Sequence, residues 1–329
     1  MKRFIFSFLI LFIISFSVAY LFFWYLKDYP VTGKDVILTI PENSSAKAIC
    51  NILQDSGVVP SSKIMFLIIK ITKNEKNLKS GEYKFFRGMS YLNVLDFLIS
   101  GKIYLFKVTI PEGLNTFEIA DLLQKREVIN SAKDFVNVCN NIHAIKNFLN
   151  NGFSMEGYLF PDTYKFYKHE DIKKVIKIMN ENFIKKVLPV YKKSKTYFTL
   201  NEVVTLASII QKETYNKKEM PVIASVFINR LKRGMRLQSD PTIIYGLWDE
   251  LKGPLKRSDL KIENEYNTYL NYGLPPTPIS NPGIAAIKAV LNPAKTDYLY
   301  FVSSGKGYHI FAKTYKQHLR NIRKYLKAR

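Results

Sequence analysis

Residues 36–53, VILTIPENSSAKAICNIL, and residues 106–123, FKVTIPEGLNTFEIADLL, follow one pattern and decide the fold of the first half of the chain. The triplet Ile40-Pro41-Glu42 returns seventy residues later as Ile110-Pro111-Glu112. Each stretch opens with alternating apolar residues, which predict a strand, and continues with apolar residues at helical spacing. We therefore expect two related strand-helix units that share one core.

The segment between the two units adds another strand and another helix. Gly81 to Phe85 is a turn leading into a strand, and a helix is expected from Ser90 to Ile99, ended by Gly101. The region 34–150 is therefore predicted to be a small α/β region. Such modules commonly bind extended polymers, and a spacer that holds a domain away from a membrane fits the residues equally well.

Residues 152–329 change to turn formers and aromatic residues, and we expect a mixed α+β domain there. Thr199 and Glu202 form a capping box at the start of one helix. The predicted helices lie at about 171–188, 200–213 and 221–234, another opens at 280–282, and a hairpin of 298–302 with 308–312 precedes a basic final helix.

The N-terminal residues 4–26 contain no charged side chain and are long enough as a helix to span a bilayer. Lys2 and Arg3 precede the segment, which favours a cytoplasmic N-terminus. Ser17-Val18-Ala19 could be a signal-peptide cleavage site, but the apolar run continues to Leu26 and favours an uncleaved anchor. We expect a single-pass protein of the cytoplasmic membrane, anchored by residues 1–26, with its C-terminal bulk outside the cytoplasm.

Composition excludes several classes of protein. The chain has 329 residues, is 47% hydrophobic and carries a net charge of +22, so it is far too apolar to be a disordered basic tail. The lysines run through the whole chain instead of gathering with aromatic residues on one segment, which argues against a nucleic-acid partner.

Motifs for metals, nucleotides and serine chemistry are missing from the sequence. Cys50 and Cys139 stand alone and are expected to be buried free thiols. Histidines form no HExxH, and neither a phosphate loop nor a GxSxG elbow occurs. We therefore predict no metal and no cofactor.

Four carboxyl residues, Glu156, Asp162, Glu213 and Asp240, stand outside charged helix faces. Glu156 precedes a glycine and is consistent with an ordinary turn acid. Asp162 follows a proline and Asp240 precedes one, so both are suited to turns or helix caps. Glu213 differs, because helical spacing places Leu206 and Ile210 beneath it at the C-terminal end of its helix. Burial and the helix dipole both disfavour its charged form and raise its pKa, as a general acid requires, although structural acids can be perturbed too.

Several motifs together resemble the endolytic murein transglycosylase family and its YceG domain. The resemblance covers the membrane segment and nearly all that follows. The matching runs are 156–164 (EGYLFPDTY), 207–214 (ASIIQKET), 226–231 (VFINRL), 234–242 (GMRLQSDPT), 245–246, 266–269 (YNTY), 273–276 (GLPP), 281–283 (NPG) and 298–302 (YLYFV).

The resemblance implies a bacterial envelope enzyme that cuts nascent peptidoglycan strands internally and so ends their elongation. It places the catalytic glutamate at Glu213. Where the family commonly has Glu-Lys-Glu-Thr, this chain has Gln211-Lys212-Glu213-Thr214, which leaves Glu213 as the only carboxylate of the motif. The region before residue 152 resembles the LysM-like, carbohydrate-binding part of the family. Glycan strands are the implied partner, together with cell-wall synthases or division proteins.

In the expected mechanism Glu213 protonates the oxygen between N-acetylmuramic acid and N-acetylglucosamine, and then accepts the proton of the muramoyl 6-hydroxyl as that oxygen closes a 1,6-anhydro ring. A hydrolase would need a second carboxylate, for which Asp240 is the candidate. Hydroxyl, carboxyl, amide and aromatic groups that could contact sugars are predicted at Tyr158, Thr214, Gln238, Asp240, Asn267 and Tyr269, each of which could equally be structural.

A rival hypothesis from another class is a noncatalytic, membrane-anchored scaffold that grips peptidoglycan through its repeats. The intact Glu213-Thr214 motif argues against it.

Overall fold

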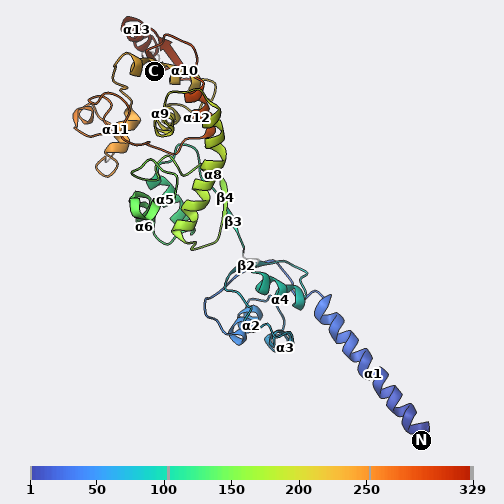
Figure 1. Cartoon of the computed structure of the whole chain (residues 1–329). Coiled ribbons are helices and arrows are strands. Elements are labelled where there is room, and N and C mark those ends of the chain that lie inside the picture. Colours follow the sequence, from blue (N-terminus) through green and yellow to red (C-terminus); the bar gives the residue numbers. More distant parts are fainter. Residues whose placement is uncertain (1, 102–103, 252, 327–329) are drawn as a thin grey trace. The chain divides into compact units, whose positions relative to one another are not determined.

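The computed structural model describes residues 2–101, 104–251 and 253–326, and the chain divides into two compact units, Met1–Phe106 and Lys107–Arg329 (Figure 1). Both units combine helices with two-stranded sheets. The predicted α+β class is therefore confirmed.

The first unit pairs one small antiparallel sheet with short helices. Val36 lies opposite Phe85 and Ile40 opposite Gly81 in the sheet. The elements in chain order are α1 (Lys2–Lys27), β1 (Val36–Ile40), α2 (Ala46–Asp55), α3 (Ser62–Ile71), β2 (Gly81–Phe85) and α4 (Tyr91–Ser100).

The core of the first unit is built from the apolar faces that the sequence pattern predicted. Leu53, Tyr83, Phe85 and Leu98 are completely buried in one cluster. Gly101 ends α4 in the left-handed conformation at φ 65°, as expected of a glycine in this position.

Both copies of the repeat fold alike, as strand, helix and helix. In the first copy the Gln54 side chain accepts a hydrogen bond from the backbone N–H of Ser62, and in the second Gln124 accepts one from Ala132, seventy residues later. The two glutamines therefore join consecutive helices in the same way.

The expectation that both copies share one core is wrong. The first copy belongs to the unit Met1–Phe106, and the second belongs to Lys107–Arg329. The physical reason is pairing within the second unit, where Ile110 donates to the carbonyl of Asp162 and Gly113 to that of Asn281. The second copy therefore packs with the elements that follow it in the unit Lys107–Arg329.

The second unit contains the remaining elements, which surround α9 (Figure 1). They are β3 (Phe106–Thr109), α5 (Thr116–Lys125), α6 (Ala132–Asn140), α7 (Ile142–Ile145), β4 (Thr163–Phe166), α8 (Ile172–Lys193), α9 (Leu200–Glu213), α10 (Met220–Lys232), α11 (Asp240–Gly246), the 3-10 helix η1 (Asp259–Lys261), α12 (Ile284–Leu291), β5 (Tyr300–Ser303), β6 (His309–Ala312) and α13 (Tyr315–Leu326). Strand β3 pairs with β4, and β5 pairs with β6 in the expected hairpin.

Helix α9 is the central element of the second unit. It begins with the predicted capping box of Thr199 and Glu202, and every residue from Val203 to Gln211 is buried. Helices α10, α11 and α12 pack against it. A helix buried on all sides presents its last residue, Glu213, from a rigid support.

Helix α1 is continuous from Lys2 to Lys27. Within the described part of the chain, none of the helices has both the length and the apolar character needed to cross a membrane. The span expected at residues 4–26 therefore has no support in the structure.

Candidate functional site

Glu213 lies at the C-terminal end of α9 and lines a pocket of about 510 Å³. Beneath it, Leu206 and Ile210 are completely buried, as the helical spacing predicted. Gln238, Asp240 and Tyr269 line the same pocket. The structure thus brings together four of the residues that the sequence proposed for the site.

The environment of Glu213 raises the pKa of its carboxyl above the usual value, chiefly because burial penalises the charged form. The negative charge of Asp240 acts in the same direction. A hydrogen bond from Ser239 and the positive charges of His309 and Arg230 act in the opposite direction. Glu213 is therefore an acid whose proton is retained to higher pH than in water, as a general acid requires.

The N-terminus of α11 holds the carboxyl of Glu213 in place. Ser239 is the N-cap residue, yet its hydroxyl does not cap the helix and instead donates a hydrogen bond of 2.5 Å to Oε1 of Glu213. Next to it, Asp240 is exposed and its Oδ1 accepts a 2.5 Å hydrogen bond from the hydroxyl of Tyr269. Asp240 therefore is not the cap residue of α11, and its carboxyl instead bonds to another residue that lines the pocket.

Arg230 was not singled out from the sequence, although it lies in the matching run 226–231. It is buried and donates from Nε to the carbonyl of Leu299 at 2.7 Å and from Nη1 to that of Leu237 at 2.6 Å. Its guanidinium also lies 5.2 Å from the ring centre of Tyr300. Arg230 therefore joins three segments of the pocket wall and brings a positive charge near Glu213.

The C-terminal helix α13 forms another part of the wall that the sequence did not predict. Tyr315, His318 and Ile322 face the pocket from this helix, and the ring of His318 stacks on Tyr300 at 5.2 Å. Burial and the charge of Arg230 lower the pKa of His318, which favours the neutral imidazole. Only the fold could place these residues, since they lie a hundred residues after Glu213.

Three other predicted sugar contacts do not line the pocket. Tyr158 is buried and packs against Phe183 with ring centres 4.7 Å apart. Thr214 is buried and its hydroxyl accepts from the N–H of Asn216, which forms the turn after α9. The Asn267 amide is buried, donates to the carbonyls of Leu260 and Ile262, and accepts from the N–H of Tyr269. These three side chains support the local fold.

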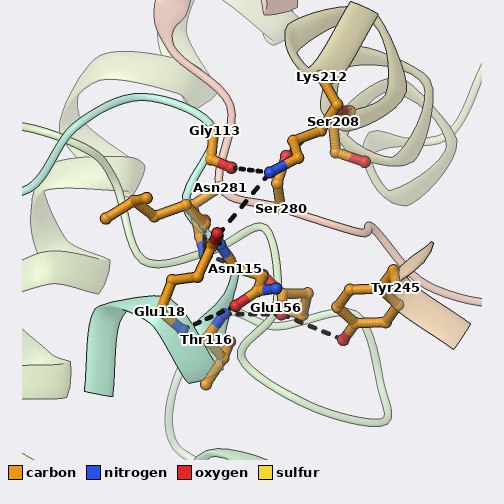
Figure 2. Close-up of polar contacts among 11 residues, drawn as sticks. Gly113, Asn115, Thr116, Glu118, Glu156, Ser208, Lys212, Tyr245, Ser280 and Asn281 are labelled. Carbon is orange, nitrogen blue, oxygen red and sulfur yellow. Dashed lines mark hydrogen bonds and ion pairs between the residues drawn. The ribbon is translucent and has the colours of Figure 1, made fainter. Parts of the chain in front are cut away.

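Glu156 lies in a turn, as the sequence suggested, and its side chain is buried there. Its carboxylate accepts hydrogen bonds from the N–H of Thr116 at 2.9 Å, the hydroxyl of Tyr245 at 3.1 Å and the amide of Asn281 at 2.9 Å (Figure 2). Burial raises its pKa to about 7. The donors come from α5, α11 and the loop before α12, so this one carboxyl connects the second repeat to the elements around α9.

Lys212 makes a second connection beside Glu213 (Figure 2). Its ammonium donates to the carbonyl of Gly113 at 3.2 Å and lies 3.8 Å from a carboxylate oxygen of Glu118. Asp162, the remaining acid of the four, accepts hydrogen bonds from Lys186 at 2.6 Å and from Asn182 at 2.9 Å and does not line the Glu213 pocket.

Both cysteines are free and buried, as predicted. No group of three or more histidine, cysteine, aspartate or glutamate side chains is placed to hold a metal ion among the residues that the structure describes.

Comparison with known proteins agrees with the resemblance seen in the sequence. The chain is 35% identical over 92% of its length to an endolytic murein transglycosylase of Bacillus subtilis, of which it covers 87%. It is 30% identical over its whole length to an endolytic murein transglycosylase of Streptococcus pneumoniae, of which it covers 66%.

A solved structure has the same fold. The crystal structure of a yceG-like protein from Listeria monocytogenes matches with a TM-score of 0.60 and 32% identity, over 87% of this chain and 98% of that one. The model of the YceG-like family matches residues 38–324, which include nearly all of the first repeat, the second repeat and the whole Glu213 pocket. The chain belongs to the YceG-like family.

Proposed function

We propose that this protein is a lytic transglycosylase that cuts peptidoglycan strands internally, between N-acetylmuramic acid and N-acetylglucosamine, and leaves 1,6-anhydro ends. The observation that carries the proposal is the carboxyl of Glu213, which faces a pocket, has a raised pKa and is held by Ser239. The names of the Bacillus and Streptococcus relatives support the same activity.

The proposed reaction uses Glu213 twice. As an acid it gives its proton to the glycosidic oxygen while the bond from that oxygen to C1 of the muramoyl residue breaks. As a carboxylate it then takes the proton of the muramoyl 6-hydroxyl, whose oxygen bonds to C1. Glu213 ends protonated, the products are an anhydro end and a free 4-hydroxyl, and no water is consumed.

The hydrogen bond from Ser239 is compatible with these steps because it engages only one of the two carboxyl oxygens of Glu213. Its hydroxyl donates to Oε1, so Oε1 is an acceptor and the proton of the neutral acid resides on Oε2. Gln238, Asp240 and Tyr269, which line the pocket, are the proposed sugar contacts. Hydroxyl, amide and carboxyl groups can bond to sugar hydroxyls, and the Tyr269 ring can cover a sugar face.

A hydrolase would need a second carboxylate that activates water. Asp240 is the candidate, but one of its oxygens already accepts the hydroxyl of Tyr269. This contact favours a positioning role for Asp240. The noncatalytic scaffold is not favoured either, because the named relatives are enzymes.

The proposal includes a location outside the cytoplasm, where peptidoglycan lies, and a single-pass anchor formed by residues 4–26. The anchor is supported by the uncharged sequence between Arg3 and Lys27. We also propose that the LysM-like first unit contacts glycan, and that synthases or division proteins are partners. A reporter fused after Arg329 tests the topology: activity of a reporter that works only in the cytoplasm would contradict it.

The decisive experiment for the activity is digestion of purified glycan strands by the full chain, followed by mass analysis of the new ends. Anhydro ends are expected. Reducing ends would identify a hydrolase, and intact strands would favour the scaffold.

A further inference from the structure

A second pocket, of about 500 Å³, lies at the other end of α11 from Glu213. Asp240, the first residue of α11, lines the Glu213 pocket, and Tyr245 and Gly246, the last two, line this one. A helix of seven residues is about 10 Å long at roughly 1.5 Å per residue. The two pockets are therefore separated by a distance that a short oligosaccharide spans.

Aromatic side chains form the wall of the second pocket. Phe117 and Trp248 stack with ring centres 5.5 Å apart and an angle of 12° between their planes. Tyr245 lies 6.3 Å from Phe117 and 4.9 Å from Tyr266. Phe153, which is 65% exposed, also lines the pocket. The wall thus offers several ring faces within one small volume.

Hydrogen bonds behind the wall hold these rings in place. The hydroxyl of Tyr245 donates to the buried Glu156, as Figure 2 shows. The hydroxyls of Tyr266 and Thr277 lie 2.8 Å apart. Gly246 permits the close packing, because a Cβ there would lie 2.3 Å from Oδ1 of Asn264. A rigid aromatic wall loses little entropy when a ligand binds.

The polar groups at this pocket limit the kind of ligand. Ser154, Asn264, Asp249 and Glu265 line it, and the described lining residues include no basic side chain, in a chain of net charge +22. Anionic ligands such as phosphates are therefore disfavoured. Ring faces combined with amide, hydroxyl and carboxyl groups suit a neutral sugar, which has apolar C–H faces and a hydroxyl rim.

We propose that this pocket binds an N-acetylhexosamine unit of the glycan strand at a distance from the cleaved bond. The choice of sugar rests on the proposed function, whereas the pocket itself does not. A glycan strand that is bound at both ends of α11 is aligned over Glu213. Long strands should therefore be cleaved faster than short fragments.

Tryptophan fluorescence tests the proposal directly, because Trp24 and Trp248 are the only two tryptophans. In the full chain carrying Trp24→Phe and Glu213→Gln, Trp248 is the sole tryptophan and cleavage is blocked. Titration with a short β-1,4-linked N-acetylglucosamine oligomer should change its emission saturably. Phe117→Ala in this background should raise the Kd at least about tenfold, the usual loss when an aromatic contact is truncated.

Tyr197→Ala is the matched control, since Tyr197 is an aromatic residue that is 70% exposed and does not line either pocket. It should leave the Kd unchanged. Circular dichroism of the Phe117→Ala protein shows whether it is folded, and if it is not, Phe117→Leu, which keeps apolar volume without the ring, should weaken binding in the same direction.

An oligomer that binds by calorimetry without changing Trp248 emission would overturn the proposal. So would an emission change caused by a sugar-free stem peptide and not by the oligomer. The activity is judged separately by strand cleavage in the wild-type chain: cleavage without a Trp248 response rejects only the second pocket, and a Trp248 response without cleavage rejects only the proposed function.

Discussion

The hydroxyl of Ser239 donates a hydrogen bond of 2.5 Å to Oε1 of Glu213, although Ser239 stands at the N-cap position of α11. A serine at this position usually bonds to the backbone of its own helix. Here the hydroxyl instead joins the start of α11 to the end of α9. The carboxyl of Glu213, the proposed catalytic acid, is therefore held by a residue 26 positions later in the chain.

The change Ser239→Ala should lower strand cleavage by about tenfold, because the acid loses the group that orients it. The pH profile should also change. The Ser239 hydrogen bond lowers the pKa of Glu213, so its loss raises that pKa. Since the acid must be protonated to act, the fall in rate at high pH should move to higher pH. Cleavage rates measured across pH check both effects.

Ser225→Ala is a suitable control for this change. Ser225 is also a buried serine, but it bonds to the carbonyl of Val222 and to Thr296, away from Glu213. Its loss should leave the pH profile in place. A Ser239→Ala enzyme with the wild-type profile would refute the orienting role.

Arg230→Ala should destabilise the protein by about 3 kcal/mol. The change leaves the buried carbonyls of Leu237 and Leu299 without their charged donor, and each unpaired group costs about 1–3 kcal/mol. Urea unfolding measures the loss. Arg233→Ala, at an exposed arginine that ends the same helix, should change stability by less than about 0.5 kcal/mol. Equal losses in the two variants would show that the buried hydrogen bonds contribute nothing.

The raised pKa of Glu156 predicts that the folded protein is more stable at mildly acidic pH than at neutral pH. Its pKa is raised from 4.5 to about 7 in the folded state, so between these values the folded state holds a proton that the unfolded state has released. The free energy of unfolding that Glu156 contributes is fully present below about pH 4.5 and is lost as the pH rises toward 7. The loss is about 3 kcal/mol at about 1.36 kcal/mol per pKa unit.

The comparison with Glu156→Gln isolates this contribution. Glutamine has no titrating proton, so the difference in unfolding free energy between wild type and variant should vary with pH over this range. Asp162 does not interfere, because Lys186 and Asn182 hold its pKa at about 2. A difference that is constant from pH 4.5 to pH 8 would contradict the raised pKa of Glu156.

Local patterns predicted most elements of the fold. The alternation at 36–40, the capping box at Thr199 and Glu202, and the glycine after α4 each determine a strand or a helix end through neighbouring residues alone. The packing partner of the second repeat could not be predicted, since it depends on pairing with distant residues such as Asp162 and Asn281. The sequence similarity of the two repeats indicates that they fold alike. It does not indicate which other segments each repeat packs against.

The site shows the same limit. The raised pKa of Glu213 could be predicted because its own helix supplies apolar surroundings. Tyr158 and Asn267 were predicted to contact sugar from their chemical type, yet both are buried. The turn position of Glu156 could be predicted, but its burial could not, because its three donors come from distant segments, at Thr116, Tyr245 and Asn281.

Glu213→Gln should reduce strand cleavage at least about a hundredfold while the protein stays folded, because glutamine keeps the size of the side chain and has no proton to give. Asp240→Asn should still cleave. Its amide oxygen can accept the Tyr269 hydroxyl, and loss of the negative charge that raises the pKa of Glu213 should move the high-pH fall in rate to lower pH. Mass analysis of the ends and circular dichroism of both variants provide the measurements. If Glu213→Gln produced anhydro ends at nearly the original rate and a folded Asp240→Asn protein did not, Asp240 would be the acid, and the role assigned to Glu213 would be wrong.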